Sequence, residues 1–238
     1  MRWLTAGRGI VHSEMFPLLD RSAPNPLELF QIWLNSAGAD KLVDPYFTML
    51  WEGDIARHLA TDDAGRTTEV TVIAGRLGEA VGPPPPPDSW AARADADVAI
   101  WHLRLDPGAA WRLPPAAGPE SHRVLYVFEG DTLRVDGVEV ANDTGVVLRP
   151  DAPVPLAVGE TEVEALLLQG RPIGEPVAQY GPFVMTTDDE IEQAFRDYRA
   201  TQFGGWPWAD EAPTHGRDTG RFARHVDGRV EEPDPAPA

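Results

Sequence analysis

A series of short segments between residues 69 and 169 most constrains what this chain can fold into. Apolar side chains alternate with polar ones along each segment, as in a strand that buries one face. In 98–105 the alternation places Trp101, Leu103 and Leu105 on the same face. Many short strands joined by regular turns are typical of an all-β sandwich or barrel. The expected strands are 69–75, 98–105, 124–128, 133–135, 138–140, 145–148, 154–158 and 162–169.

Two local signals define connections between these strands. Asp136-Gly137 separates two alternating segments and predicts a hairpin with a type I′ turn, because this dipeptide accepts positive φ at both central positions. The unbroken proline run 83–87 cannot donate hydrogen bonds to a sheet and predicts a stiff, extended surface loop.

One helix is predicted near the C-terminal end of the sequence. Thr187 and Glu190 have the spacing of a capping box. An apolar stripe at helical spacing follows and must pack against another part of the protein. The stripe consists of Ile191, Ala194, Phe195 and Tyr198. Gly204 and Gly205 are expected to end the helix.

Three further segments predict a buried strand, a linker and a disordered tail. The run 27–34 is almost entirely apolar and predicts a strand buried on both faces. Residues 53–66 are polar and predict a linker. Residues 206–238 are rich in charged residues, proline and glycine, which predicts a disordered tail.

The composition excludes several classes of function. The 238 residues carry a net charge of −18, from 20 basic and 38 acidic side chains. Such a chain repels phosphate backbones, so direct nucleic-acid binding is not expected. There are no cysteines, which excludes disulfides, thiolate metal sites and cysteine nucleophiles. The sequence has no apolar stretch of signal-peptide or membrane-span type, so we expect a cytoplasmic protein without membrane contact.

A histidine and a carboxylate lie two residues apart near the start of the sequence. In the run 5–14, His12 and Glu14 would point to the same face of a strand at Ile10 to His12, after a tight turn at Gly7 and Gly9. Such a pair is half of a metal site, since a non-haem iron site needs at least three protein ligands. An isolated pair of this kind is more often a simple ion pair.

The surroundings of this pair resemble the pirin family of bicupin proteins. The matching segments are 3–15, 29–35, 41–46 and 170–185, and the likeness extends over about residues 1–205. The resemblance implies an all-β cupin fold with a C-terminal α-helix, in which the N-terminal barrel of the bicupin is incomplete. It implies four parts: 1–52 as a remnant of the N-terminal cupin, 53–66 as a linker, 67–205 as the C-terminal cupin with its closing helix, and 206–238 as a tail.

The same resemblance implies a metal site and an activity. Pirins hold Fe(II) through a His-x-His pair and then through a His and a Glu, which His12 and Glu14 match. It assigns both residues as metal ligands and Glu14 also as catalytic, in quercetin 2,3-dioxygenase-type oxidoreductase chemistry. No His-x-His occurs in this sequence, so we expect Fe(II) binding to be weak or absent. The remaining histidines are not expected to be ligands: His58, His102, His122, His215 and His225.

Smaller expectations complete the prediction. The C-terminal cupin should be metal-free. Gln31 and Trp33 share a strand face and could line the N-terminal cavity, although a core position for Trp33 is the simpler interpretation. The segment 181–185 should be structural and should position the helix.

Two hypotheses of different class remain open. In the first, the protein is an iron-dependent dioxygenase acting on a flavonol-like small molecule, and the first part of the N-terminal cupin is missing from this sequence. In the second, it is a non-catalytic pirin-like protein that acts through binding or regulation, for example with a protein partner.

Overall fold

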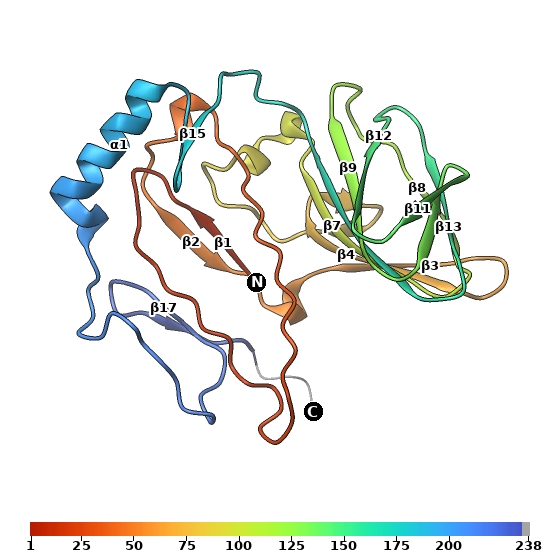
Figure 1. Cartoon of the computed structure of the whole chain (residues 1–238), viewed down its shortest axis with the longest axis horizontal. Coiled ribbons are helices and arrows are strands. Elements are labelled where there is room, and N and C mark those ends of the chain that lie inside the picture. The colour runs from red at the N-terminus through yellow and green to blue at the C-terminus, as the bar shows by residue number, and fades with distance from the viewer. Residues whose placement is uncertain (235–238) are drawn as a thin grey trace. The chain divides into compact units, whose positions relative to one another are not determined.

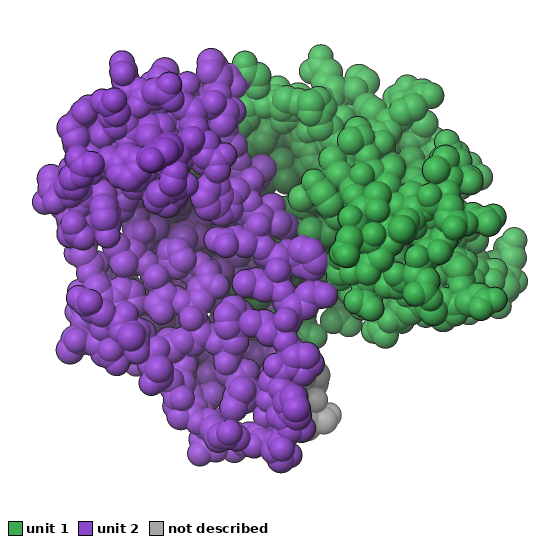
Figure 2. All heavy atoms as spheres, in the orientation of Figure 1, with its two compact units in different colours: residues 1, 52–174 green, residues 2–51, 175–238 purple. Residues whose placement is uncertain are grey.

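The structure is a computed structural model that describes residues 1–234. It consists of two compact units, shown in Figure 2: residues 52–174 with Met1 form the first, and residues 2–51 with those from 175 onward form the second. The segment 67–205, which we expected to be one domain, is therefore divided between them.

The first unit contains most of the strands. In chain order they are β3 (Arg57–Thr61), β4 (Thr67–Ala74), β5 (Arg76–Leu77), β6 (Ala80–Val81), β7 (Ala99–Leu105), β8 (Ala110–Leu113), β9 (His122–Glu129), β10 (Thr132–Val135), β11 (Val138–Ala141), β12 (Thr144–Leu148), β13 (Val154–Val158) and β14 (Val163–Gly170). Short 3-10 turns occupy Glu52–Asp54, Trp90–Ala92 and Ala94–Ala96. The strands expected from the alternation between 69 and 169 are confirmed, with small shifts of their ends.

Two antiparallel sheets enclose the core of this unit. The order of the larger, six-stranded sheet is β12-β9-β14-β7-β4-β3, and that of the four-stranded sheet is β11-β10-β13-β8. Figure 1 labels all of these strands except β10 and β14. Every second residue of the central strands is buried, so that Leu103, Leu125 and Leu167 are fully inaccessible. Leu133 and Leu156 of the smaller sheet belong to the same cluster. The all-β class predicted from the alternation is thereby confirmed.

The hairpin predicted at Asp136-Gly137 is present. Leu133 pairs with Val140 and Val135 with Val138, so two residues connect the strands. Asp136 has φ of 49° and Gly137 has φ of 81°, as a type I′ turn requires. The proline run 83–87 forms no helix or strand, as predicted.

The expected linker 53–66 contains a strand instead. β3 pairs with β4 along its whole length and forms the edge of the six-stranded sheet. Asp62 holds the connecting turn, since its Oδ1 accepts hydrogen bonds from the backbone N–H of Ala64 (2.9 Å) and Arg66 (3.0 Å). These bonds, led by that from Arg66, lower the pKa of the Asp62 carboxyl. An edge strand needs only one partner, so its polar composition does not prevent pairing.

The second unit contains shorter elements. They are β1 (Arg2–Thr5), a 3-10 turn (Gly38–Asp40), β2 (Tyr46–Met49), β15 (Ala178–Tyr180), β16 (Phe183–Met185), the helix α1 (Asp188–Thr201), a 3-10 turn (Gln202–Gly204), β17 (Ala223–Arg224) and β18 (Val230–Glu231). Each strand belongs to a two-stranded antiparallel sheet: β1 with β2, β15 with β16, and β17 with β18.

The apolar run 27–34 forms no strand, and the expectation that it is buried on both faces is wrong. Leu27 is 61% exposed, Leu29 59% and Trp33 56%. Hydrophobic periodicity predicts a buried strand only where another strand supplies the hydrogen-bond partners. No strand of the described residues pairs with this run.

Helix α1 begins with the predicted capping box. The Thr187 Oγ1 accepts a hydrogen bond from the Glu190 backbone N–H (3.3 Å), and Glu190 Oε2 accepts one from the Thr187 backbone N–H (3.0 Å). The helix ends one turn before the expected glycines, because Gln202 adopts a left-handed conformation with φ of 50°. The apolar stripe is only partly buried: Ile191 is 5% exposed, whereas Tyr198 is 40% exposed.

The hairpin of β15 and β16 supports the helix, as expected for the segment 181–185. The Phe183 ring packs edge-on against Phe195 with centroids 4.9 Å apart, and Tyr180 lies 5.9 Å from the same ring. Gly181 turns the chain between the strands with φ of 57°, a value that favours glycine.

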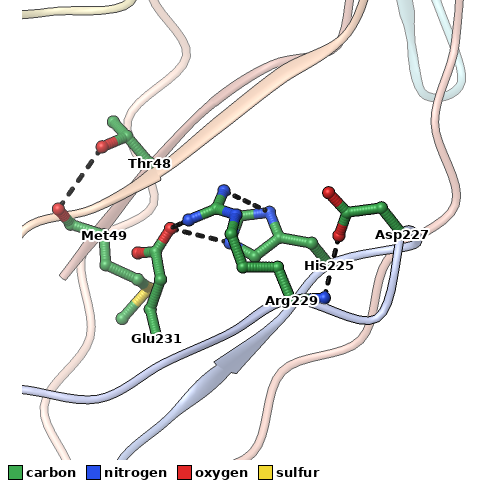
Figure 3. Close-up of polar contacts among 6 residues, drawn as sticks. All are labelled: Thr48, Met49, His225, Asp227, Arg229 and Glu231. Carbon is green, nitrogen blue, oxygen red and sulfur yellow. Dashed lines mark hydrogen bonds and ion pairs between the residues drawn. The ribbon is translucent and has the colours of Figure 1, made fainter.

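The described part of the expected disordered tail contains a second hairpin, β17 with β18. Figure 3 shows its side chains: His225 Nε2 lies 2.8 Å from Glu231 Oε1, and Arg229 contacts both residues. The His225 ring also lies 5.2 Å from Phe47 of β2. Residues 235–238 of the predicted tail lie outside the described residues. Within the described chain, no helix is both long and apolar enough to span a bilayer.

The first testable prediction concerns Ile191 and Phe195, two residues of the helix stripe that differ in burial. We expect Ile191→Ala to cost about 2–4 kcal/mol, because the side chain is almost fully buried. Phe195→Ala should cost about 2 kcal/mol, less than a fully buried phenylalanine, because its ring is only half-buried. Urea unfolding measures the loss of stability in each variant. The exposed Glu192→Ala is the control, and it should change stability by less than about 0.5 kcal/mol. Equal, negligible losses at 191 and 195 would mean that the helix is not packed on the protein.

The second prediction concerns acid. Hydrogen bonds from Thr186 lower the pKa of Glu190, so the folded state favours the ionised carboxylate. This contribution to stability is present above the unfolded pKa of about 4.3 and is lost as the pH falls through the lowered folded value. We expect the melting temperature of the parent protein to fall more between about pH 5 and 3 than that of Glu190→Gln.

Asp189→Asn is the matched control, because Asp189 lies in the same helical turn but takes no part in the capping box. Parent and Glu190→Gln curves that stay parallel over this pH range would contradict a role for the ionised Glu190.

Candidate metal centre

The segment that leads to His12 begins with a tight turn after β1. Gly7 has φ of 53° and Gly9 has φ of 117°, and the Gly9 N–H donates to the Ala6 carbonyl oxygen at 2.9 Å. A Cβ on Gly7 would lie 2.2 Å from the carbonyl oxygen of Val43, so the backbone approaches too closely for any side chain. The turn predicted from these two glycines is confirmed.

The strand expected at Ile10 to His12 is absent, and this correction removes the same-face argument. Residues 10–14 form neither strand nor helix, and the side chains of His12 and Glu14 are exposed. Without regular extended backbone, a separation of two residues does not by itself bring the imidazole and the carboxylate together.

Glu14 forms an ion pair with Arg2 of β1. The guanidinium Nη2 contacts Glu14 Oε1, and the two side chains are 21% and 36% exposed. Burial lowers the pKa of Arg2, although an arginine stays protonated at neutral pH. The carboxylate that would donate electron pairs to a metal is thus already neutralised by a cation.

The surroundings of His12 favour the neutral form of its imidazole. Partial burial lowers the pKa of its imidazole, and the positive charge of Arg2 lowers it further. The ring is therefore neutral at pH 7, with a lone pair on one nitrogen. The Arg2 guanidinium therefore has opposite effects on the two candidate ligands. It favours the neutral imidazole of His12, which can bind a metal, but it competes with a metal for the Glu14 carboxylate.

These two residues do not make a complete metal site. Among residues 1–234, no group of three or more His, Cys, Asp and Glu side chains is placed to hold an ion. A non-haem iron centre takes at least three protein ligands, such as two histidines and a carboxylate. His12 and Glu14 alone are fewer protein ligands than such a centre requires.

The other histidines have structural surroundings. His102 Nε2 lies 2.6 Å from Glu164 Oε2, and its ring stacks near Phe128 with centroids 5.9 Å apart. His215 lies 5.0 Å from Phe222. His58 lies on β3, and His122 begins β9.

Gln31 and Trp33, proposed as lining a cavity, are both exposed, and a core position for Trp33 is wrong. The cluster of His225, Arg229 and Glu231 in Figure 3 was not predicted from the sequence. The Asp227–Gly228 turn between its strands was the available signal.

Comparison with known proteins identifies the class of fold. The model of the pirin C-terminal cupin domain matches residues 100–204, which run from β7 to the end of the 3-10 turn after α1. A crystal structure of quercetin 2,3-dioxygenase from Acinetobacter baumannii is similar with a TM-score of 0.59 and 26% identity, over 71% of this chain and 55% of that one. The chain therefore has the cupin fold that the family resemblance implied.

Relatives that match most of the chain identify the protein family. A pirin-like protein of Caulobacter vibrioides is 34% identical over 209 residues, which cover 85% of this chain and 67% of its own length. A Pseudomonas aeruginosa protein, provisionally named a quercetin 2,3-dioxygenase, is 35% identical over 205 residues and is matched over 66% of its length. This chain belongs to the pirin family. It spans about two thirds of the length of these relatives.

Proposed function

We propose that this pirin-type cupin carries two ligands, His12 and Glu14, of a dioxygenase-type metal site that needs further ligands from outside the described residues. The observation behind the proposal is that Arg2 forms an ion pair with Glu14 and also lowers the pKa of His12, so that both candidate ligands lie near the same guanidinium. Among residues 1–234, no group of three or more possible ligands is found. Relatives that bear the name quercetin 2,3-dioxygenase support the reaction class. Fe(II) is the expected metal, and a flavonol-like molecule is the expected substrate of the complete site.

A third prediction follows for metal binding. Two ligands leave most of the coordination sphere to water, so the 238-residue chain should retain far less than one equivalent of iron after purification. It should also show no quercetin-dependent oxygen uptake. Anaerobic titration with Fe(II), followed by calorimetry, should detect weak binding that His12→Ala and Glu14→Ala both abolish.

His122→Ala is the matched control, because His122 is an exposed histidine at the start of β9 and should not affect metal binding. Stoichiometric iron in the purified chain would contradict the incomplete site. Weak binding that survives His12→Ala would instead contradict the assignment of His12 as a ligand.

The second candidate is a non-catalytic binding or regulatory role, and the ion pair between Arg2 and Glu14 favours it. A carboxylate held by a guanidinium can be purely structural, connecting β1 to the segment after the turn. In that case the protein acts through its surface with a protein partner, and the His-Glu pair is a remnant without chemistry.

Substitution of Arg2 distinguishes the two candidates within the same titration. If Glu14 is a ligand, Arg2→Gln removes a competitor and should tighten Fe(II) binding by up to about fivefold, the equivalent of a partly exposed ion pair of about 1 kcal/mol. If the pair is only structural, Arg2→Gln should lower the melting temperature slightly and leave metal binding unchanged.

A further inference from the structure

The interior of the cupin barrel contains an arginine that forms no ion pair among the described residues. Arg123 of β9 is fully inaccessible to solvent. Its Nη2 donates to the carbonyl oxygen of Pro114 at 2.8 Å. Its Nε and Nη1 are buried without any hydrogen-bond acceptor among the described residues. Buried arginines are normally paired with carboxylates, because an unpaired buried charge is costly.

Two neighbouring strands place further unpaired polar atoms on the same interior face. Gln169 of β14 lies directly opposite Arg123 in the ladder, and its Oε1 is buried without a donor from residues 1–234. Trp101 of β7 pairs with Leu167, two residues before Gln169 on the same face, and its buried indole N–H has no acceptor in the described part of the chain. β7 and β9 are labelled in Figure 1, and β14 lies between them in the sheet.

The carboxylate of Asp97, whose charge acts on Arg123, forms its hydrogen bonds with other groups. Asp97 opposes the effect of burial on the pKa of Arg123, but it forms no direct hydrogen bond with the guanidinium. Its Oδ2 accepts hydrogen bonds from Ser121 Oγ (2.5 Å) and from the backbone N–H of Ala117 (3.1 Å) and Gly118 (3.2 Å). Asp97 therefore fixes the loop that leads into β9, and the guanidinium is left without a bonded anion.

The pattern of unpaired atoms defines the chemistry of a ligand. Arg123 and Trp101 offer N–H donors, and Gln169 offers one acceptor oxygen. A carboxylate accepts from several donors at once and neutralises the guanidinium. A hydroxyl group on the same molecule would donate to Gln169 Oε1. Because all these atoms are buried, the molecule must be small.

We propose that the barrel interior, at Arg123, Gln169 and Trp101, binds a small hydroxycarboxylate. The carboxylate accepts hydrogen bonds from the unused N–H groups of Arg123 and from the Trp101 indole, and the hydroxyl donates to Gln169. The site lies within the first unit and uses neither His12 nor Glu14, so it stands or falls independently of the metal site.

Glycolate, the smallest hydroxycarboxylate, is the probe, added to the whole 238-residue chain. At ten times its Kd it should raise the melting temperature by about 3–6 °C, because it binds only the folded protein. Acetate, which lacks the hydroxyl, should bind more weakly. Arg123→Met should abolish the glycolate effect, and Gln169→Leu should reduce it to that of acetate. Tyr126→Phe is the matched control, because Tyr126 is 42% exposed on the same strand.

Trp101→Phe keeps an aromatic side chain but removes the indole N–H together with the five-membered ring, so it gives a second readout if Arg123→Met fails to fold. It should weaken glycolate binding at least several-fold. No rise in melting temperature with glycolate, or a rise unchanged in Trp101→Phe and Gln169→Leu, would overturn the proposal. Equal stabilisation by sodium chloride at the same concentration would also overturn it, since the site would then accept any small anion.

Discussion

Burial of alternate side chains between the two sheets of the cupin is the interaction on which the rest of the structure depends. Leu103, Leu125 and Leu167 occupy adjacent strands of the six-stranded sheet and are completely inaccessible. Each such side chain contributes about 1.5–3 kcal/mol relative to an exposed one. Their burial fixes the register of β7, β14 and β9, because a slip by one residue would turn every apolar side chain outward. The same register places Arg123 beside Gln169 inside the barrel.

Local patterns were sufficient to predict the parts of the fold whose cause is local. The alternation in 98–105 predicted β7, Asp136-Gly137 predicted a hairpin, and Thr187 with Glu190 predicted the start of α1. The errors concern tertiary partners. The polar segment at Arg57–Thr61 pairs with β4, whereas the apolar run 27–34 pairs with no described strand. Composition states what a segment would prefer to bury, but only the fold determines whether a partner is present.

In the candidate sites, too, the sequence predicts the residues, whereas the fold determines their contacts. A sequence resemblance implied that His12 and Glu14 are metal ligands. The ion pair between Glu14 and Arg2, however, depends on the path of the chain after the Gly7–Gly9 turn. That contact could not be read from spacing. Arg123 had an available signal, because it stands two residues before Leu125 on the alternating face that becomes buried. A charged residue in phase with a buried face indicates a buried polar group that needs a partner.

The central claim is that the cupin strands carry the stable core, while the apolar run 27–34 lies outside any sheet. Native-state hydrogen exchange tests this claim most directly, because it reports the free energy needed to open each amide. The account predicts that amides of β7, β9 and β14 exchange only through global unfolding, and that amides of 27–34 exchange near the rate of an unstructured chain. Protection of 27–34 equal to that of β9 would contradict it, since those residues would then be hydrogen-bonded in a sheet.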